Sequence, residues 1–126
     1  KAALLAHCRA LGVPAITCGA AGGRTDPTRL RAEDLARIDG DPLLAKTRYR
    51  LRRHHGFPAA GARVRPFGIV AIGSTEPVRG RAADPAAGLA CAGYGSAVTV
   101  TAPMGFAAAA ELLRLWARRA AAAGGD

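Results

Sequence analysis

Two short apolar segments, separated by a well-marked helix, limit the folds that this chain can adopt. Residues 13–18 (VPAITC) and 66–73 (PFGIVAIG) read as strands, and the first resembles a strand buried on both faces. Between them, Asp41 can accept the N-cap hydrogen bonds of a helix, Pro42 suits its first position, and Gly56 can end it. Strands that alternate with helices predict an α/β fold with a mostly parallel sheet and flanking helices.

Further elements follow from apolar spacing and from the positions of glycine and proline. Residues 1–11 carry leucine and cysteine at helical spacing, and Gly12 is expected to end that helix. The other expected elements are an extended segment at 28–32, one or two helical turns at 33–38, and an amphipathic helix at 98–119 with Pro103 near its start. We expect a mobile loop at 77–92 and a frayed tail at 120–126.

The charge balance favours a polyanionic partner. The chain has 126 residues and a net charge of +9, carried mostly by arginine. The alternative is that arginine only reflects a GC-rich genome and covers a solvated surface. Cations concentrate in the helix that begins after Asp41, whose inward face is expected to carry Leu44, Thr47 and Leu51. The cations of this helix are Lys46, Arg48, Arg50, Arg52 and Arg53.

A glycine-rich loop follows the first strand, in residues 19–23 (GAAGG). Its spacing is not that of a dinucleotide fingerprint, and residues 24–28 (RTDPT) predict turns where a phosphate site needs a helix N-terminus. A tight structural loop is therefore the preferred interpretation. The carboxyl end of a strand is still the usual place for ligands in α/β proteins. Arg24, beside this loop, and Glu76, after the second strand, are candidate substrate-binding residues on that ground.

Cysteine, histidine and the apolar stretches exclude several classes of protein. Cys8, Cys18 and Cys91 form no C-x-x-C pair, so neither a zinc site nor a disulfide framework is predicted, and a reducing cytoplasm fits best. We predict no metal site, because His7 and the pair at 54–55 have no third ligand nearby. The longest apolar stretch, 97–113, is interrupted by Pro103 and Glu111, so no membrane helix is predicted.

Several motifs occur in the order of a known family. They are AHCRALGVPAITCGAAGGRTDPTRLRAEDLARIDGDPLLAK, then RLRRHHGFP, GSTEPV and GYGSAVTVTAPMGF, and they run from Lys1 to about Arg119. This series resembles the tRNA threonylcarbamoyladenosine dehydratases of the ThiF/MoeB/HesA superfamily, which are related to ubiquitin-activating enzymes. The resemblance covers the C-terminal half of the family's length. The implied fold is the C-terminal half of a Rossmann-like, ubiquitin-activating-enzyme-type domain, and the chain is expected to be part of a longer protein.

The resemblance also implies a reaction, cofactors and partners. The implied activity is ATP-dependent cyclisation of threonylcarbamoyladenosine in tRNA through adenylation of its carboxylate. The family's ATP and Mg²⁺ sites lie mainly in its N-terminal half, so this chain alone is expected to be inactive. The implied partners are tRNA, a second copy in a homodimer, and a sulfur-transfer protein as a further candidate, in the cytoplasm.

Cys91 is the candidate catalytic residue, because it lies just before GYGS, near the family's cysteine-bearing loop. The basic helix from Lys46 to Arg53 is the candidate for contact with tRNA phosphates. Two other functions stay open. One is adenylation of the C-terminus of a small ubiquitin-like or sulfur-carrier protein, against which the absent zinc cysteines argue. The other is an inactive piece that only binds tRNA or dimerises.

Overall fold

The computed structural model describes residues 1–78 and 95–124 of the chain. The described part contains three helices, three strands and one short 3₁₀ helix. In chain order these are α1 (Ala2–Ala10), β1 (Ile16–Cys18), η1 (Pro27–Arg29), β2 (Leu30–Asp34), α2 (Pro42–His54), β3 (Val70–Ser74) and α3 (Val98–Ala123). The α/β class is therefore confirmed. Most of the predicted mobile loop at 77–92, including Cys91, lies outside the described residues.

The sheet has the strand order β1-β3-β2 and is mixed. β1 pairs with β3 in parallel, with Ile16 opposite Val70. β2 pairs with β3 antiparallel, with Leu30 opposite Ser74. The prediction of a mostly parallel sheet is therefore only partly right. The one or two helical turns expected at 33–38 are only partly right, because β2 continues to Asp34 and a single turn follows, closed by the Ile38 N–H donating to the Asp34 carbonyl at 3.1 Å.

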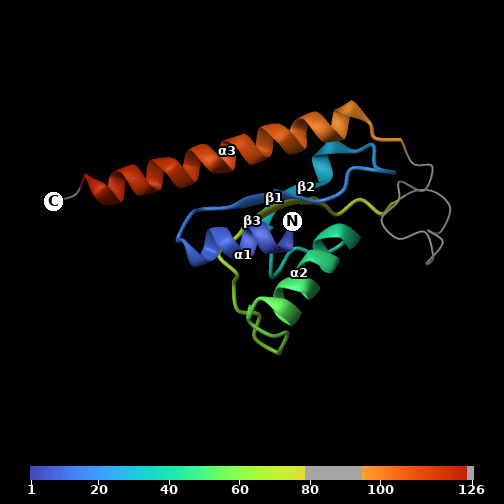
Figure 1. Cartoon of the computed structure of the whole chain (residues 1–126). Helices are drawn as coiled ribbons and strands as arrows, with labels where there is room; N and C mark the ends of the chain where they lie inside the picture. Colours follow the sequence, from blue (N-terminus) through green and yellow to red (C-terminus); the bar gives the residue numbers. More distant parts are fainter. Residues whose placement is uncertain (79–94, 125–126) are drawn as a thin grey trace.

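The helices cover both faces of this sheet (Figure 1). α3 crosses one face, where Val100 and Met104 pack with Ile72 of β3. α1 and α2 lie on the opposite face, where Ala71 of β3 joins the larger core. Successive side chains of a strand point to opposite faces, so adjacent residues of β3 serve different cores.

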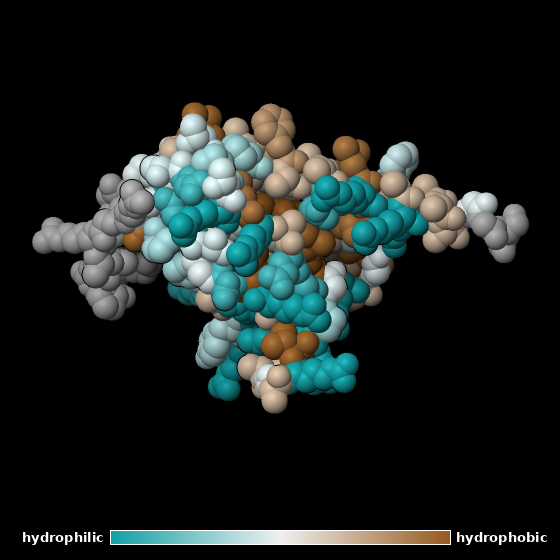
Figure 2. Space-filling model, turned by 180° about the vertical axis from the view of Figure 1, so that it is seen from behind, coloured by the Kyte–Doolittle hydropathy of each residue, from teal (hydrophilic) through white to brown (hydrophobic). Residues whose placement is uncertain are grey.

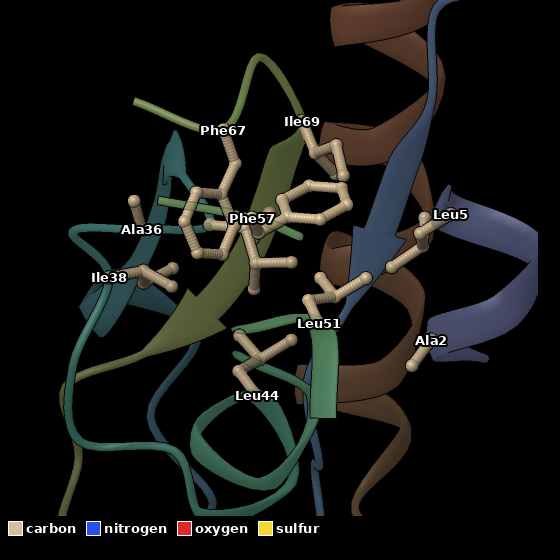
Figure 3. Packing of buried hydrophobic residues seen from close by; sticks show 11 residues of the cluster. Ala2, Leu5, Ala36, Ile38, Leu44, Leu51, Phe57, Phe67 and Ile69 are labelled. Atoms are coloured by element: carbon tan, nitrogen blue, oxygen red, sulfur yellow. The ribbon is translucent and has the colours of Figure 1, made fainter. Parts of the chain in front are cut away.

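The larger core, between the sheet and the helices α1 and α2, is formed by buried apolar side chains. Leu44 and Leu51 of α2 point toward Leu5 of α1 and toward Phe57 and Phe67 from the connecting segments (Figure 3). The two phenyl rings meet edge to face, with centroids 4.9 Å apart and an interplanar angle of 71°. This core fixes α2 against the sheet and so determines where the N-terminus of α2 lies.

α2 has the ends that the sequence predicts. The Asp41 carboxylate accepts a hydrogen bond from the Leu44 backbone N–H at 3.0 Å, and Pro42 is the first helical residue. Gly56, just beyond the helix, has a φ of +66°, a left-handed conformation that glycine adopts without strain. Leu44, Thr47 and Leu51 are buried, as expected.

α3 is longer and more exposed than the sequence predicts. Pro103 lies in its second turn without ending it. Residues 98–122 are long and apolar enough to cross a membrane by length and composition only, a criterion that helices of soluble proteins also meet. Apolar side chains stand along the margin of the molecule formed by α3 (Figure 2). The exposed ones are Val98, Phe106, Leu112, Leu113 and Trp116.

Candidate functional site at the carboxyl edge of the sheet

The glycine loop and residues 74–76 meet at one edge of the sheet. β1 and β3 are parallel, so their carboxyl ends lie at the same edge, as in other α/β sites. The Gly19 backbone N–H donates to the Ile72 carbonyl at 2.8 Å, which draws the start of the loop onto β3. β2 runs the other way, so its first residue and the preceding η1 also reach this edge.

Arg24 is the centre of the hydrogen-bond network at this edge. Its side chain is completely buried, and its guanidinium donates to the Asp41 carboxylate at 3.0 Å. It also donates to the backbone carbonyls of Gly40 at 2.8 Å and Glu76 at 3.1 Å, and to that of Ala20. With its side chain buried and these acceptors engaged, Arg24 holds three segments of the chain together.

Asp41 links the helix cap to the glycine loop. Besides capping α2, its carboxylate accepts a hydrogen bond from the Ala20 backbone N–H at 2.9 Å. A Cβ atom added at Gly19 would lie 2.2 Å from Asp41 Oδ2, closer than real Cβ atoms come. Glycine at position 19 is therefore required by close packing against the carboxylate, and not by an unusual φ.

Glu76 anchors the turn that follows the glycine loop. One carboxylate oxygen accepts from the backbone N–H groups of Asp26, at 2.8 Å, and Thr25, at 2.9 Å. The other accepts from the Thr25 hydroxyl. The bond from the Asp26 N–H is the largest cause that lowers the pKa of Glu76, with the bonds from Thr25 adding to it. The Ser74 hydroxyl accepts from the Glu76 N–H at 3.1 Å, so this side chain is also engaged within the site.

Lowering the pH is expected to destabilise the turn at Thr25 and Asp26, because it protonates the Glu76 carboxylate. A carboxyl whose pKa is lower in the folded state contributes stability above its ordinary pKa of about 4.3, and this contribution is lost as the pH falls through the folded value. Replacing Glu76 with glutamine removes one of the two acceptor oxygens. In urea titrations between pH 6 and pH 3, the wild type should lose more stability than E76Q.

The matched control is Glu33→Gln, at an exposed position on β2. This variant should follow the wild type at every pH, because the hydrogen bonds of Glu76 are intact in it. Equal pH profiles for wild type and E76Q would contradict the role assigned to the carboxylate.

This edge of the sheet does not have the geometry of a phosphate-binding loop. After the glycine loop come turns and then η1, in which the Asp26 side chain accepts from the Thr28 N–H at 2.9 Å. That bond and one from the Thr28 hydroxyl lower the pKa of Asp26. No α-helix follows the glycine loop directly, and the N-terminus of α2, which meets the loop, is capped by the Asp41 carboxylate, so the loop does not lead into the free N–H groups and dipole that hold a pyrophosphate. Within residues 1–78 and 95–124, no group of three His, Cys, Asp or Glu side chains could hold a metal ion.

The five predicted cations of α2 fall into two groups. Arg48 donates to the carbonyls of Leu35, at 3.5 Å, and Ile38, while Arg52 donates to that of Pro58 at 3.1 Å. Burial lowers the pKa of the Arg48 guanidinium, and the neighbouring charge of Arg52 adds to this. The other group is exposed and comprises Lys46, Arg50 and Arg53. Helical spacing in the sequence places the exposed group on one face with Arg48 and Arg52 beside it, but it does not show that these two arginines have acceptors within the protein.

Among the described residues, Cys8, Cys18 and the histidine pair at 54–55 are not further candidates for a catalytic or ligand-binding role at this edge. Cys18, at the end of β1, is partly buried, and burial raises the pKa of its thiol although Lys1 opposes this. Cys8 lies in α1, away from the glycine loop. The pair at 54–55 is exposed at the C-terminal end of α2, where a positive charge interacts favourably with the helix.

Sequence reasoning missed how much of the site is held by Asp41. The residue is recognisable as an N-cap, but its second contacts come from residues 20 and 24, which are distant in the sequence. A buried arginine is rare unless it is paired, so Arg24 between glycines and a turn also gave no local signal of burial. Tyr49, exposed among the cations of α2, was overlooked as well.

Comparisons with known proteins give similarity over almost the whole chain. No family model matches it. It is 38% identical over 118 residues to the tRNA threonylcarbamoyladenosine dehydratase of Haemophilus influenzae (strain ATCC 51907 / DSM 11121 / KW20 / Rd), a match that covers 90% of this chain and 44% of that protein. It is 35% identical over 139 residues to the enzyme of the same name from Escherichia coli (strain K12), covering 98% and 50%.

Solved structures give the same result. The crystal structure of the E. coli dehydratase in complex with ATP has a TM-score of 0.79 and 36% identity, and the match covers 98% of this chain and 45% of that one. The complex of the same enzyme with AMP has a TM-score of 0.78 and 37% identity. The chain thus spans about half the length of the relatives that it matches. In sequence and in fold, the chain is therefore similar over its length to about half of these tRNA threonylcarbamoyladenosine dehydratases, which confirms the resemblance carried by its motifs.

Proposed function

We propose that this chain is part of an enzyme that cyclises threonylcarbamoyladenosine in tRNA at the expense of ATP. The observation that carries the proposal is the combined match in sequence and fold, at 36% identity and a TM-score of 0.79, to the E. coli dehydratase in complex with ATP. The similarity extends over 98% of the chain, so it does not depend on a single motif.

The proposed chemistry activates a poor electrophile. The threonyl carboxylate attacks the α-phosphate of ATP, which gives an acyl-adenylate and releases pyrophosphate. A nucleophilic atom of the carbamoyl group then attacks the activated carbonyl and AMP leaves, so the nucleoside loses one water overall. The substrate carries its own nucleophile. The protein therefore has to bind and orient the substrate and exclude bulk water from the site.

The role proposed for this chain is to shape the site and hold the RNA. The glycine loop does not fit the phosphates of ATP, so the proposal assigns ATP and Mg²⁺ mainly to sequence outside this chain. Arg24 and Glu76 would act by keeping the loop and the turn in place. Of the five predicted cations of α2, phosphate contacts are proposed for the exposed ones, Lys46, Arg50 and Arg53, while Arg48 and Arg52 support the helix through backbone carbonyls. Cys91 is retained as the candidate catalytic residue, although the cyclisation as written needs no enzyme thiol.

The proposed assembly is a cytoplasmic homodimer. The exposed apolar side chains of α3, such as Phe106 and Trp116, are consistent with a further protein surface against this helix. A sulfur-transfer protein is kept as a further candidate partner, on the resemblance alone.

Mass analysis of the nucleosides tests the proposed reaction. The complete gene product is incubated with ATP, Mg²⁺ and threonylcarbamoylated tRNA, and the tRNA is then digested. We expect a modified adenosine lighter by one water that forms only when ATP is present. No mass change from a folded protein that binds ATP would overturn the proposal. Adenylation of a small carrier protein in the same preparation would point to the alternative substrate.

A further inference from the structure

The exposed face of α2 carries an aromatic residue, Tyr49, which contacts with phosphates alone do not explain. Tyr49 is 62% exposed and lies between cations at helical spacing, with Lys46 three residues before it and Arg53 four residues after it. Arg50 is its neighbour in the chain. Together these four residues form what we call the α2 stripe. It extends over about 10 Å of the helix, at 1.5 Å per residue.

The charges around the stripe are of one sign. The helix from Pro42 to His54 contains no acidic residue. The nearest carboxylates in the chain precede it, and Asp41 is buried in its pair with Arg24. Asp39 lies close enough to Arg48 to oppose in part the lowering of the pKa of that guanidinium by burial. The stripe therefore presents positive charge to solvent from a helix that contains no carboxylate of its own.

The structure also separates the stripe from the structural arginines. Arg48 and Arg52 donate to backbone carbonyls, and the guanidinium of Arg52 lies 5.3 Å from the centre of the Phe67 ring. These contacts hold the helix to its core and use both side chains. The cations of the stripe are exposed. The division leaves an aromatic ring with three exposed cations on the side of α2 that faces away from the core.

We propose that the α2 stripe binds an unpaired segment of RNA, with Tyr49 stacking on a base and the three cations on phosphates. In single-stranded nucleic acid the bases can stack on an aromatic side chain, whereas in a duplex they already stack on one another. An aromatic ring among cations therefore suits a single strand better than a duplex. Because the N-terminus of α2 is tied to the glycine loop through Asp41, the stripe leads directly away from the candidate site. This inference rests on the proposed tRNA substrate and adds the mode of recognition.

Binding measurements on the complete gene product test the stacking contact. The probes are an RNA hairpin with a single-stranded loop and a blunt RNA duplex of equal length. Tyr49→Ala should weaken hairpin binding about 5- to 150-fold, the range typical of one base stacked on an aromatic ring. Tyr49→Phe should bind like the wild type, and Tyr49→Leu like Y49A, since only the ring is flat. Duplex binding should be unchanged in all three.

The salt dependence tests the phosphate contacts. Arg50→Ala should lower the slope of log Kd against log salt by about 0.7, the value for one phosphate on a single strand. The matched control is Arg114→Ala, an exposed arginine of α3 on the opposite face of the sheet, which should leave the slope unchanged. Thermal melts of each variant show whether it is folded.

The outcomes separate this inference from the proposed function. Dehydration of tRNA by the wild type together with unchanged hairpin affinity in folded Y49A would overturn the stacking contact and leave the reaction standing. Equal losses for hairpin and duplex would also overturn it, because a purely electrostatic surface does not need the ring. A selective loss for the hairpin supports the stripe even if the nucleoside mass does not change.

Discussion

Replacing Arg24 with methionine will lower the free energy of unfolding by about 3–5 kcal/mol, which is the usual cost of removing one partner of a buried ion pair. The side chains of Arg24 and Asp41 are both fully buried, so water cannot replace the lost partner. The carbonyls of Ala20, Gly40 and Glu76 lose their donor as well. Urea denaturation of R24M and wild type measures the difference.

Two further variants make the Arg24 prediction specific. Arg29→Met removes an exposed guanidinium that lies 3.4 Å from the Asp26 carboxylate, and solvent screening limits its expected cost to below about 1 kcal/mol. In R24M the unpaired charge is the Asp41 carboxylate, so R24M combined with Asp41→Asn should be less destabilised than the sum of the single changes. A cost for R24M no larger than that of R29M would show that the buried network does not hold this edge together.

Replacing Leu51 with alanine is expected to cost about 2–5 kcal/mol, because it opens a cavity that the surrounding core cannot fill completely. Leu51 is fully buried between α1 and the two phenyl rings (Figure 3). The loss should appear as a lower midpoint in urea with an unchanged slope. Loosening α2 should also disturb the Asp41 contacts at its N-terminus.

Leu4→Ala is the matched control for Leu51. Leu4 is 67% exposed in α1, so its truncation should change the stability by no more than about 0.5 kcal/mol. Similar costs at both positions would mean that the helices pack differently from Figure 3.

Local signals in the sequence predicted the elements whose ends depend on a few neighbouring residues. Asp41, Pro42 and Gly56 determine α2 because capping, a fixed φ and a left-handed turn all act within one helical turn. Gly12, with a φ of +65°, ends α1 in the same way. The order of family motifs predicted the relationship to the dehydratases, because similarity in sequence carries over to the fold.

Strand pairing could not be predicted in the same way. The orientation of β2 depends on the residues of β3 opposite it, which are about 40 positions away in the chain. The turn after β2 depends on Asp34, whose carboxylate accepts from the Ala36 N–H at 2.8 Å and from the distant Phe67 N–H at 2.9 Å. The helical pattern at 33–38 is therefore limited to one turn, in part by a contact with Phe67 that a local window does not contain.

By itself, then, the sequence determined the helix ends, the α/β class, the basic face of α2 and the family resemblance, all of which depend on residue type and short spacing. Only the tertiary structure decided which charges are available to a partner. It buried Arg24 against Asp41, engaged Arg48 and Arg52 with backbone carbonyls, and left the α2 stripe exposed. The physical reason is that the role of an arginine depends on burial and on acceptors that come from distant parts of the chain, and neither is encoded in its own neighbourhood.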